Sequence, residues 1–360
     1  MASSSAASRI KRAVVASPFL YLAWLCFTEM DRHKLQAHQE PALSSRKIEW
    51  GGVSIPILWD FHHVPFLDEI FRGITVTFSP SALGFDAVSS WHMFNFLTDL
   101  GPIYALWLLE STRGANAWTP AYFATSWSTL AQLVGIGTIA PLFYYLAIVF
   151  GPTASDLTGP RSKSSSNRLL RPEYYTPLLL PLILAFHNAE IFAAYLSPGL
   201  ETRHYWVWAW QLAPLWIGIA NVVLAKTLVP LVTSSASLKR ASPTTLLAGV
   251  SLVSAGVWAY TLVYSPYPLK EIFLSGVYQR ETEFLPHTRR ALQFDQLCSV
   301  GAHFLWLAYS IGDLVLAGKV GGGELFWPVA LAPVVAAAAG PGSALAFIWS
   351  WREARLDQSL

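Results

Sequence analysis

The segment from Trp91 to Glu110 is long and apolar enough to cross a bilayer, yet it carries Asn95 and Asp99 well inside it. A carboxylate at that depth costs about 2.5–3.5 kcal/mol on insertion scales and therefore marks a functional site by default. Two further apolar runs also contain polar groups; these are His187, Asn188 and Glu190 in one run and Asp295, His303 and Asp313 in the other. We expect the chain to fold into a helical bundle that shelters these side chains from lipid.

The composition is that of a membrane protein. Hydrophobic residues make up 53% of the chain and charged residues only 13%, whereas a soluble domain carries about 25% charged residues. The formal net charge of +2 gives no reason to expect nucleic acid as a partner. The two cysteines, Cys26 and Cys298, lie far apart in apolar segments, so they exclude a disulfide framework and are expected to be inert core residues.

Eight segments are long and apolar enough to span about 30 Å of hydrocarbon. They are residues 13–27, 89–110, 121–150, 178–196, 205–232, 243–264, 292–317 and 325–349. This pattern predicts an all-α fold, a polytopic transmembrane helical bundle of about eight spans. Residues 57–78 carry too many charges for a ninth span and predict an interfacial or re-entrant helix.

The chain divides into two parts on this interpretation. Residues 1–56 form an N-terminal anchor helix and a polar loop, and residues 57–360 form a multi-helix transmembrane catalytic domain. Lysine and arginine are balanced between the two sides, so membrane orientation is not predicted. We find no internal repeat of the kind that many transporters show.

Asn95 and Asp99 lie on one face of an ideal helix. The Asn95 amide could donate a hydrogen bond to Asp99 and fix its rotamer, and Pro102 would loosen the helix and widen a cavity. The alternative is that Asp99 clamps neighbouring helices together, a common role of buried polar groups. Glu110 and Arg113 are best explained as an interfacial ion pair.

The second polar group contains His187, Asn188 and Glu190. His187 and Glu190 are three residues apart, so an imidazole–carboxyl pair is geometrically easy. Asn188 points roughly 100° away and would contact another helix. These residues add a second carboxyl group at membrane depth.

The third polar group places Asp295 and His303 on one stripe of a helix, with Tyr309 and Asp313 further along it. His303 alone is more simply a core histidine with satisfied hydrogen bonds. Three helices that each bring a carboxyl group to mid-membrane nevertheless favour a shared cavity, and we predict that Asp99, Glu190 and Asp295 border it.

Several common catalytic motifs are absent. We find no DDxxD or NSE-type set, no HExxH, no GxSxG, no trusted metal-ligand spacing, no P-loop and no Rossmann fingerprint. Asn95 and Asp99 match the first half of the NxxxDxxxD motif of intramembrane prenyltransferases, but Ile103 stands at the last position. We therefore predict a protein that uses neither a metal nor a redox cofactor.

The remaining chemistry is that of an acid in an aromatic cavity. The chain has 16 Trp, 14 Tyr and 20 Phe residues, most of which we expect to face lipid. Rings that line a dry cavity stabilise cations by about 2 kcal/mol or more. A carboxyl group kept protonated by burial can donate its proton at neutral pH. Together these features suit protonation of an epoxide or alkene and control of the carbocation that follows.

The segments NFLTDLGPIYALWLLES and QLVGIGTIAPLFYYLA, with the run HNAE, are similar to the fungal membrane-bound meroterpenoid cyclases, the group that includes the ascochlorin, ascofuranone and macrophorin pathway enzymes. The likeness extends from about residue 57 onward. It implies cyclisation of a farnesyl chain on an aromatic or cyclohexenone head, started by protonation. The positions within the matching runs are Asn95, Asp99, His187, Asn188 and Glu190.

We therefore predict an integral membrane terpene cyclase of secondary metabolism, an isomerase or lyase of the endoplasmic reticulum, acting on a lipophilic prenylated substrate. Asp99, oriented by Asn95, is the first choice for the acid; Glu190 with His187 is the second and Asp295 the third. The residues predicted to bind substrate are Asn188, His303, Tyr309 and Asp313. The main alternative is a proton-coupled transporter or lipid-binding membrane protein that uses the same carboxylates, and a sterol or lipid isomerase is a weaker one.

Overall fold

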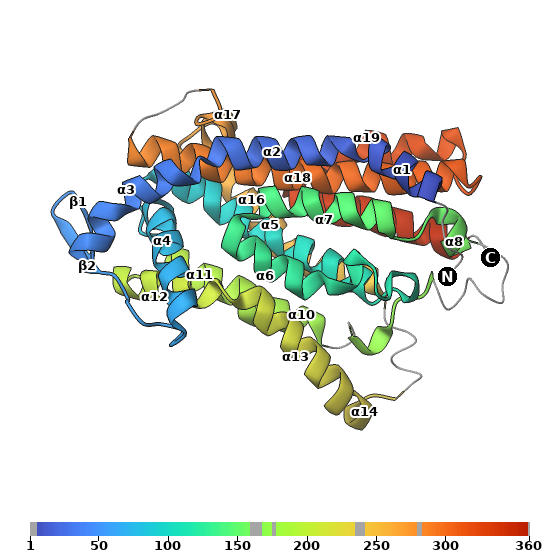
Figure 1. Ribbon diagram of the computed structural model, residues 1–360, viewed down its shortest axis with the longest axis horizontal. Helices are drawn as coiled ribbons and strands as arrows, with labels where there is room; N and C mark the ends of the chain where they lie inside the picture. The colour runs from blue at the N-terminus through green and yellow to red at the C-terminus, as the bar shows by residue number, and fades with distance from the viewer. Residues whose placement is uncertain (1–5, 159–167, 175–177, 235–241, 279–282, 359–360) are drawn as a thin grey trace.

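The structure is a computed structural model that describes residues 6–158, 168–174, 178–234, 242–278 and 283–358. It is an elongated, all-α bundle in which the longest helices run side by side (Figure 1). The strands found in these ranges form one antiparallel hairpin, β1 (Lys47–Trp50) with β2 (Val53–Pro56). Gly51 and Gly52 join them with positive φ, which a two-residue turn of this type requires.

The helices fall into two halves along the chain. The first half contains α1 (Ala6–Val15), α2 (Ser17–Met30), α3 (Arg32–Ser45), α4 (Pro65–Ala82), α5 (Ala87–Ser111), η1 (Gly114–Asn116), η2 (Pro120–Phe123), α6 (Ala124–Val134), α7 (Ile136–Phe150) and α8 (Ala154–Thr158). The second half contains η3 (Pro172–Tyr174), α10 (Leu179–Ile183), η4 (Leu184–Asn188), α11 (Ala189–Leu196), α12 (Leu200–Trp210), α13 (Ala213–Thr227), α14 (Val229–Val232), α16 (Pro243–Tyr264), α17 (Leu269–Leu274), α18 (Phe284–Leu316) and α19 (Gly322–Gln358).

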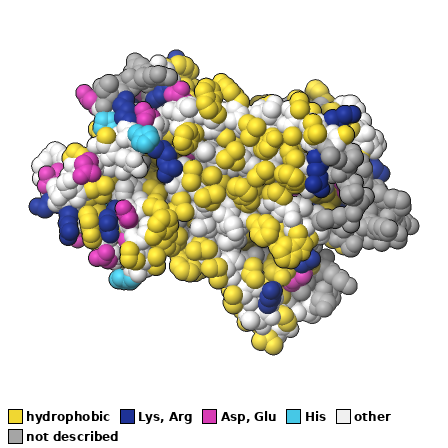
Figure 2. All heavy atoms as spheres, viewed as in Figure 1, with side chains coloured by type: hydrophobic (Ala, Val, Ile, Leu, Met, Phe, Trp, Pro, Cys, Tyr) yellow, Lys and Arg dark blue, Asp and Glu magenta, His cyan; other side chains and the backbone are white. Residues whose placement is uncertain are grey.

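The apolar helices are those of a multi-pass membrane protein. Within the described residues, four helical segments are long and apolar enough to cross a membrane: the segment of α10, η4 and α11 that ends at Leu196, and the helices Pro243–Tyr264, Phe284–Leu316 and Gly322–Leu356. Two bent helix pairs raise the number to six, with bends of 46° at α1–α2 and 53° at α12–α13. On the face shown in Figure 2, hydrophobic side chains cover the middle and charged side chains gather at the two ends. These helices account for four to six of the about eight spans that the sequence predicts.

Two of the predicted spans account for the difference. Residues 121–150 do not form one span, because Gly135, with a φ of 100°, ends α6 and begins α7, and the two helices pack against each other as a hairpin. Residues 89–110 do form a long helix, α5, but it is not among the helices apolar enough to qualify as spans. The predicted interfacial or re-entrant helix at 57–78 is helical only from Pro65 onward, as α4.

α5 is the central helix of the bundle. Every residue from His92 to Glu110 is buried, and α5 packs against α4, α11, α16, α18 and α19. Its polar side chains therefore meet neighbouring helices rather than lipid, which is why a helix with Asn95 and Asp99 in its middle can exist here.

Candidate functional site

Asp99 caps a break in a neighbouring helix. α19 is interrupted at Gly340, where φ is 84°, and resumes beyond it. The Gly342 N–H donates to Asp99 Oδ1 at 3.2 Å, and the Ser254 hydroxyl of α16 donates to the same oxygen in a short hydrogen bond. The carboxyl group thus joins α5, α16 and α19, as the clamp alternative predicts, and it lines neither of the two large cavities described below.

Asn95 does not orient Asp99. Its amide nitrogen donates to the Trp91 carbonyl and to the Thr261 hydroxyl, both at 2.7 Å. The expected Asn95–Asp99 hydrogen bond is therefore wrong. The reason is that these two acceptors take both protons of the Asn95 amide.

His187 and Glu190 do not form the expected pair. The His187 Nε2–H donates to the Leu97 carbonyl at 2.9 Å, and Nδ1 accepts from the Trp210 indole at 3.1 Å. Both ring nitrogens are thus occupied in joining α5 and α12 to the π-helical turn η4. Glu190 is 8% exposed, and its Oε2 has no hydrogen bond within the described residues. Both side-chain polar atoms of Asn188 are buried without a partner there as well.

Asp295 caps a second helix break of the same construction. Gly135 separates α6 from α7, and the Gly137 N–H donates to Asp295 Oδ1 at 2.6 Å. The sequences Gly135–Ile–Gly137 and Gly340–Pro–Gly342 therefore form the same kind of helix break. In each, the N–H of the third residue donates to an aspartate of another helix. A helix that restarts inside an apolar bundle leaves N–H groups unsatisfied, and a carboxylate is a good acceptor for them.

The surroundings distinguish the two aspartates. Asp295 lines a cavity of about 600 Å³, and its second carboxyl oxygen has no hydrogen bond within the described residues. Ligand pockets usually measure about 300–1,000 Å³. The aromatic residues around this cavity are Phe66, Phe78, Phe96, Tyr104 and Trp210.

Tyr104 and Gln132 are two of the further polar side chains on the wall of this cavity, which Gln36, Gln39, Glu40 and Thr77 also line. The Gln132 amide of α6 donates to the Tyr104 hydroxyl of α5 at 2.8 Å. The Tyr104 proton itself has no acceptor in the described part of the chain, so it is available to a ligand. Tyr104 is 2% exposed and Asp295 8%, whereas Glu69 and Arg32 line the same cavity from exposed positions. The cavity therefore runs from an open, charged mouth to a buried polar wall.

The structure does not bring the three carboxyl groups together. Asp295 lines the 600 Å³ cavity, while Asp99 and Glu190 line neither this cavity nor the second one. The expectation of one cavity shared by Asp99, Glu190 and Asp295 is therefore wrong. Spacing within one helix predicts which residues share a face of that helix. It does not predict which neighbouring helix packs on that face, so it could not predict that the three carboxyl groups lie apart.

The predicted substrate-binding residues of α18 also lie in two different places. His303 is fully buried; its Nδ1–H donates to the Ser299 carbonyl at 2.6 Å, and its ring stacks on Trp107. It is a core histidine, but its Nε2 has no hydrogen-bond partner in the described residues, so the simpler interpretation of a fully satisfied histidine holds only for Nδ1. Tyr309 and Asp313, in contrast, line a second cavity of about 270 Å³.

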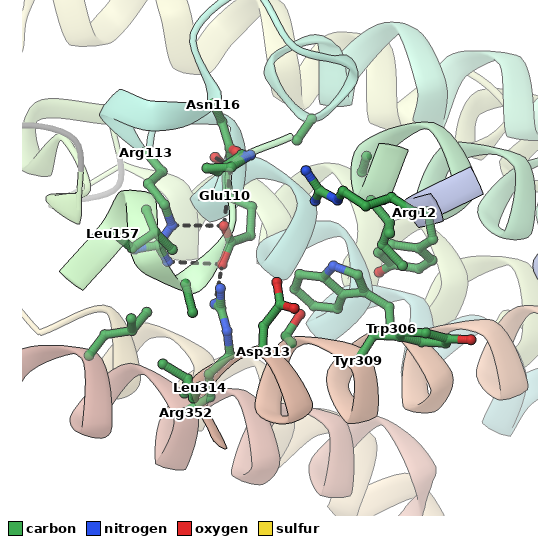
Figure 3. Close-up of a pocket in the computed structure, with 18 of the residues that line it drawn as sticks. Arg12, Glu110, Arg113, Asn116, Leu157, Trp306, Tyr309, Asp313, Leu314 and Arg352 are labelled. Carbon is green, nitrogen blue, oxygen red and sulfur yellow. Dashed lines mark hydrogen bonds and ion pairs between the residues drawn. The ribbon is translucent and has the colours of Figure 1, made fainter. Parts of the chain in front are cut away.

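This second cavity adjoins a buried ionic network (Figure 3). Arg113 pairs with Glu110 at 2.8 Å and with Glu353 at 2.7 Å, and Arg352 pairs with Glu110 at 2.8 Å. The Trp349 indole also donates to Glu110. The expected ion pair between Glu110 and Arg113 is confirmed, but it is buried and tied to α19 rather than interfacial.

Sequence reasoning missed the functional candidates Tyr104 and Gln132 and the two glycine breaks. The breaks carry a detectable signal, because both have the pattern Gly-x-Gly within an apolar run. Tyr104 and Gln132 carry none, since they meet only after α5 and α6 pack together. No group of three or more His, Cys, Asp or Glu side chains suited to a metal ion occurs in the described ranges.

The chain is similar to fungal enzymes of two kinds. It is 28% identical over 358 residues to the FAD-dependent monooxygenase verC1 of Penicillium polonicum, covering 96% of this chain and 43% of that protein. It is 29% identical over 300 residues to the FAD-dependent monooxygenase anuJ of Penicillium roqueforti (strain FM164), covering 81% and 35%. It is 27% identical over 192 residues to the terpene cyclase ascI of Acremonium egyptiacum, covering 52% and 48%. The chain thus spans less than half the length of these relatives.

The described residues do not fit the flavin dinucleotide named in two of these relatives. Gly135, Gly137 and Ala140 do have the spacing of a dinucleotide fingerprint, GxGxxA, but not its structural context. The fingerprint requires a strand before the turn and a free helix N-terminus for the pyrophosphate. Here a helix precedes the turn, and the Asp295 carboxyl group already accepts from the Gly137 N–H.

No solved structure matches the chain significantly. A family model described as the CtvD domain matches residues 42–356, which include α4 to α8 and the helices that carry Asp99 and Asp295. α1 and most of α3, which line part of the two cavities, lie before this range. The chain therefore belongs to the CtvD-domain family.

Proposed function

We propose that this chain is a membrane-embedded enzyme of secondary metabolism that cyclises a lipophilic prenylated substrate, with Asp295 as the proton donor. The observation that carries the proposal is the position of Asp295: a buried carboxyl group on the wall of a 600 Å³ cavity that aromatic rings also line. Similarity to the terpene cyclase ascI supports the same reaction class.

The reaction begins with the transfer of a proton from the free oxygen of Asp295 to an epoxide oxygen of the substrate. The carbon–oxygen bond of the epoxide breaks, and a neighbouring alkene of the prenyl chain attacks the carbon that becomes electron-deficient. The cation that results loses a proton to the Asp295 carboxylate, so the product is an isomer of the substrate. A terminal alkene would react in the same way, with the proton added to carbon.

The other residues of the cavity support this step. The Gly137 N–H holds one Asp295 oxygen and so directs the other toward the cavity. Tyr104, fixed by Gln132, can donate a hydrogen bond to the same substrate oxygen. The rings of Phe78, Phe96 and Trp210 can stabilise a carbocation through their negative faces.

Similarity to two FAD-dependent monooxygenases suggests where the epoxide comes from. Flavin monooxygenation adds one oxygen atom across an alkene, and acid opening of that epoxide is the natural next step. We infer that a separate oxidation supplies the substrate of this chain.

The test compares Asp295→Asn with Asp99→Asn in microsomes at matched protein levels. Both aspartates cap a Gly-x-Gly break, but only Asp295 lines a cavity, so the pair separates proton donation from helix capping. We expect Asp295→Asn to lose on the order of 10²–10⁴-fold of the rate, and Asp99→Asn and Glu190→Gln to retain turnover per folded molecule. The assay follows conversion of a farnesylated phenol, and of its terminal epoxide, into isomers of unchanged mass. Full turnover by Asp295→Asn would show that Asp295 is not the acid.

A further inference from the structure

The 270 Å³ cavity has opposite charges on facing walls. Arg12 and Lys11 of α1 line one side, and Asp313 of α18 lines the other. Figure 3 shows Arg12 and Asp313 directed toward the same space. In the described part of the chain the two side chains are not joined by a hydrogen bond or by an ion pair within 4.0 Å; Arg12 donates instead to the Gly151 carbonyl at 2.8 Å.

The remaining charges around this cavity are already compensated. Glu110 accepts hydrogen bonds from Arg113, Arg352 and Trp349. Arg113 is shared between Glu110 and Glu353. Arg12 and Asp313 attract each other without direct contact, and Asp313 also accepts a backbone hydrogen bond from Ala154. A ligand that matches this cavity therefore carries a negative group for Arg12 and Lys11 and a positive group for Asp313.

The cavity also has an aromatic wall and an apolar edge. The Trp306 and Tyr309 rings line it on the same helix as Asp313. Val15 of α1 and Leu316 at the end of α18 also line it, and they are 55% and 88% exposed. A helix with basic residues and exposed aliphatic residues, as α1 is, is typical of a segment at a membrane interface.

We propose that this cavity binds the headgroup of a zwitterionic phospholipid. The phosphate lies between Arg12 and Lys11, and the ammonium group lies against Asp313 between the Trp306 and Tyr309 rings. Carboxylates and aromatic faces are the usual partners of a quaternary ammonium group, and guanidinium groups are the usual partners of phosphate. The acyl chains extend along the apolar surface beside Val15 and Leu316.

Other ligands match fewer of these features. A phosphate alone leaves Asp313 facing a second negative charge, and an amine alone leaves Arg12 facing a second positive charge. A prenyl chain brings no charge to either wall. The site does not involve the 600 Å³ cavity or Asp295, so the lipid site and the proposed cyclase activity can be tested independently.

The experiment measures lipid retained by the full chain in detergent, by native mass spectrometry. The probes are dioleoylphosphatidylcholine, dioleoylphosphatidic acid, dioleoylglycerol and soluble phosphocholine. We expect phosphatidylcholine to be retained best. Arg12→Gln should lower retention of both phosphate-bearing lipids about tenfold or more, because charge-assisted hydrogen bonds are lost. Asp313→Asn should remove the preference for phosphatidylcholine over phosphatidic acid.

Arg9→Gln is the matched control, since Arg9 lies on the same helix but outside the cavity lining, against Phe150. It should retain phosphatidylcholine like the unaltered chain. Lys11→Gln, at an exposed position, repeats the phosphate test should Arg12→Gln fail to fold. Equal retention of dioleoylglycerol, or an unchanged preference in Asp313→Asn, would overturn the proposal. Equally tight binding of soluble phosphocholine would assign the site to a soluble phosphate ester instead of a lipid.

Discussion

At the residue scale, two aspartates that make the same kind of hydrogen bond differ in what surrounds them. Asp99 and Asp295 each accept a hydrogen bond from the third residue of a Gly-x-Gly break. Asp99 accepts a second one from Ser254 and lines neither large cavity, whereas Asp295 keeps one oxygen at a 600 Å³ cavity. Each aspartate keeps one oxygen without a hydrogen bond in the described residues, so the cavity beside Asp295, and not the free oxygen, distinguishes the two.

Arg113 is the residue whose loss should cost most stability. It is 1% exposed and bridges Glu110 and Glu353. Breaking a buried ionic network by removing one partner typically costs about 3–5 kcal/mol, because the remaining charges are left uncompensated. We expect Arg113→Gln to lower the free energy of unfolding by that amount in an SDS titration, or to yield little folded protein. Glu324→Gln, which removes a partly exposed pair with Arg355, should change it by less than about 1 kcal/mol.

At the element scale, close helix approach depends on the hairpin of α6 and α7. A Cβ atom on Gly137 would lie 2.6 Å from the Asp295 carbonyl oxygen and 2.7 Å from Cys26 Sγ. α7 can therefore touch both α18 and α2 only because position 137 has no side chain. The hydrogen bond that orients Asp295 depends on this approach.

Gly137→Ala should accordingly destabilise the protein by about 1–3 kcal/mol through overpacking, measured as a lower melting temperature in detergent. Gly301→Ala is the control on α18, since a Cβ there meets no atom within 4 Å. It should leave the melting temperature nearly unchanged. Equal melting temperatures for the two variants would contradict the close approach of α7 to α18.

At the scale of the whole molecule, both cysteines lie inside the bundle, as the sequence predicts. Cys26 is fully buried and Cys298 is 2% exposed, and they meet where α2 packs on α18. We expect a maleimide reagent to label neither thiol in the folded protein and both after SDS denaturation. Ser44→Cys, at an exposed position of α3, should label in the native state and serves as the positive control. Native labelling of Cys26 or Cys298 would mean that α2 does not pack on α18 in this way.

The sequence by itself determined the class of this protein. Long apolar runs and few charges require a helical membrane bundle, because only helices satisfy every backbone group within a segment. The same reasoning requires that Asn95, Asp99 and Asp295 be sheltered, and all three are buried. These conclusions depend on properties that a single segment carries with it.

Only the tertiary structure decided what shelters each polar group. Asn95 bonds Thr261 instead of Asp99, and His187 bonds Leu97 and Trp210 instead of Glu190. The partners come from helices far away in sequence, which spacing along one helix does not specify. For the same reason the break at Gly135, the cavity beside Asp295 and the ionic network with Glu353 emerge only when α5, α7, α18 and α19 are packed together.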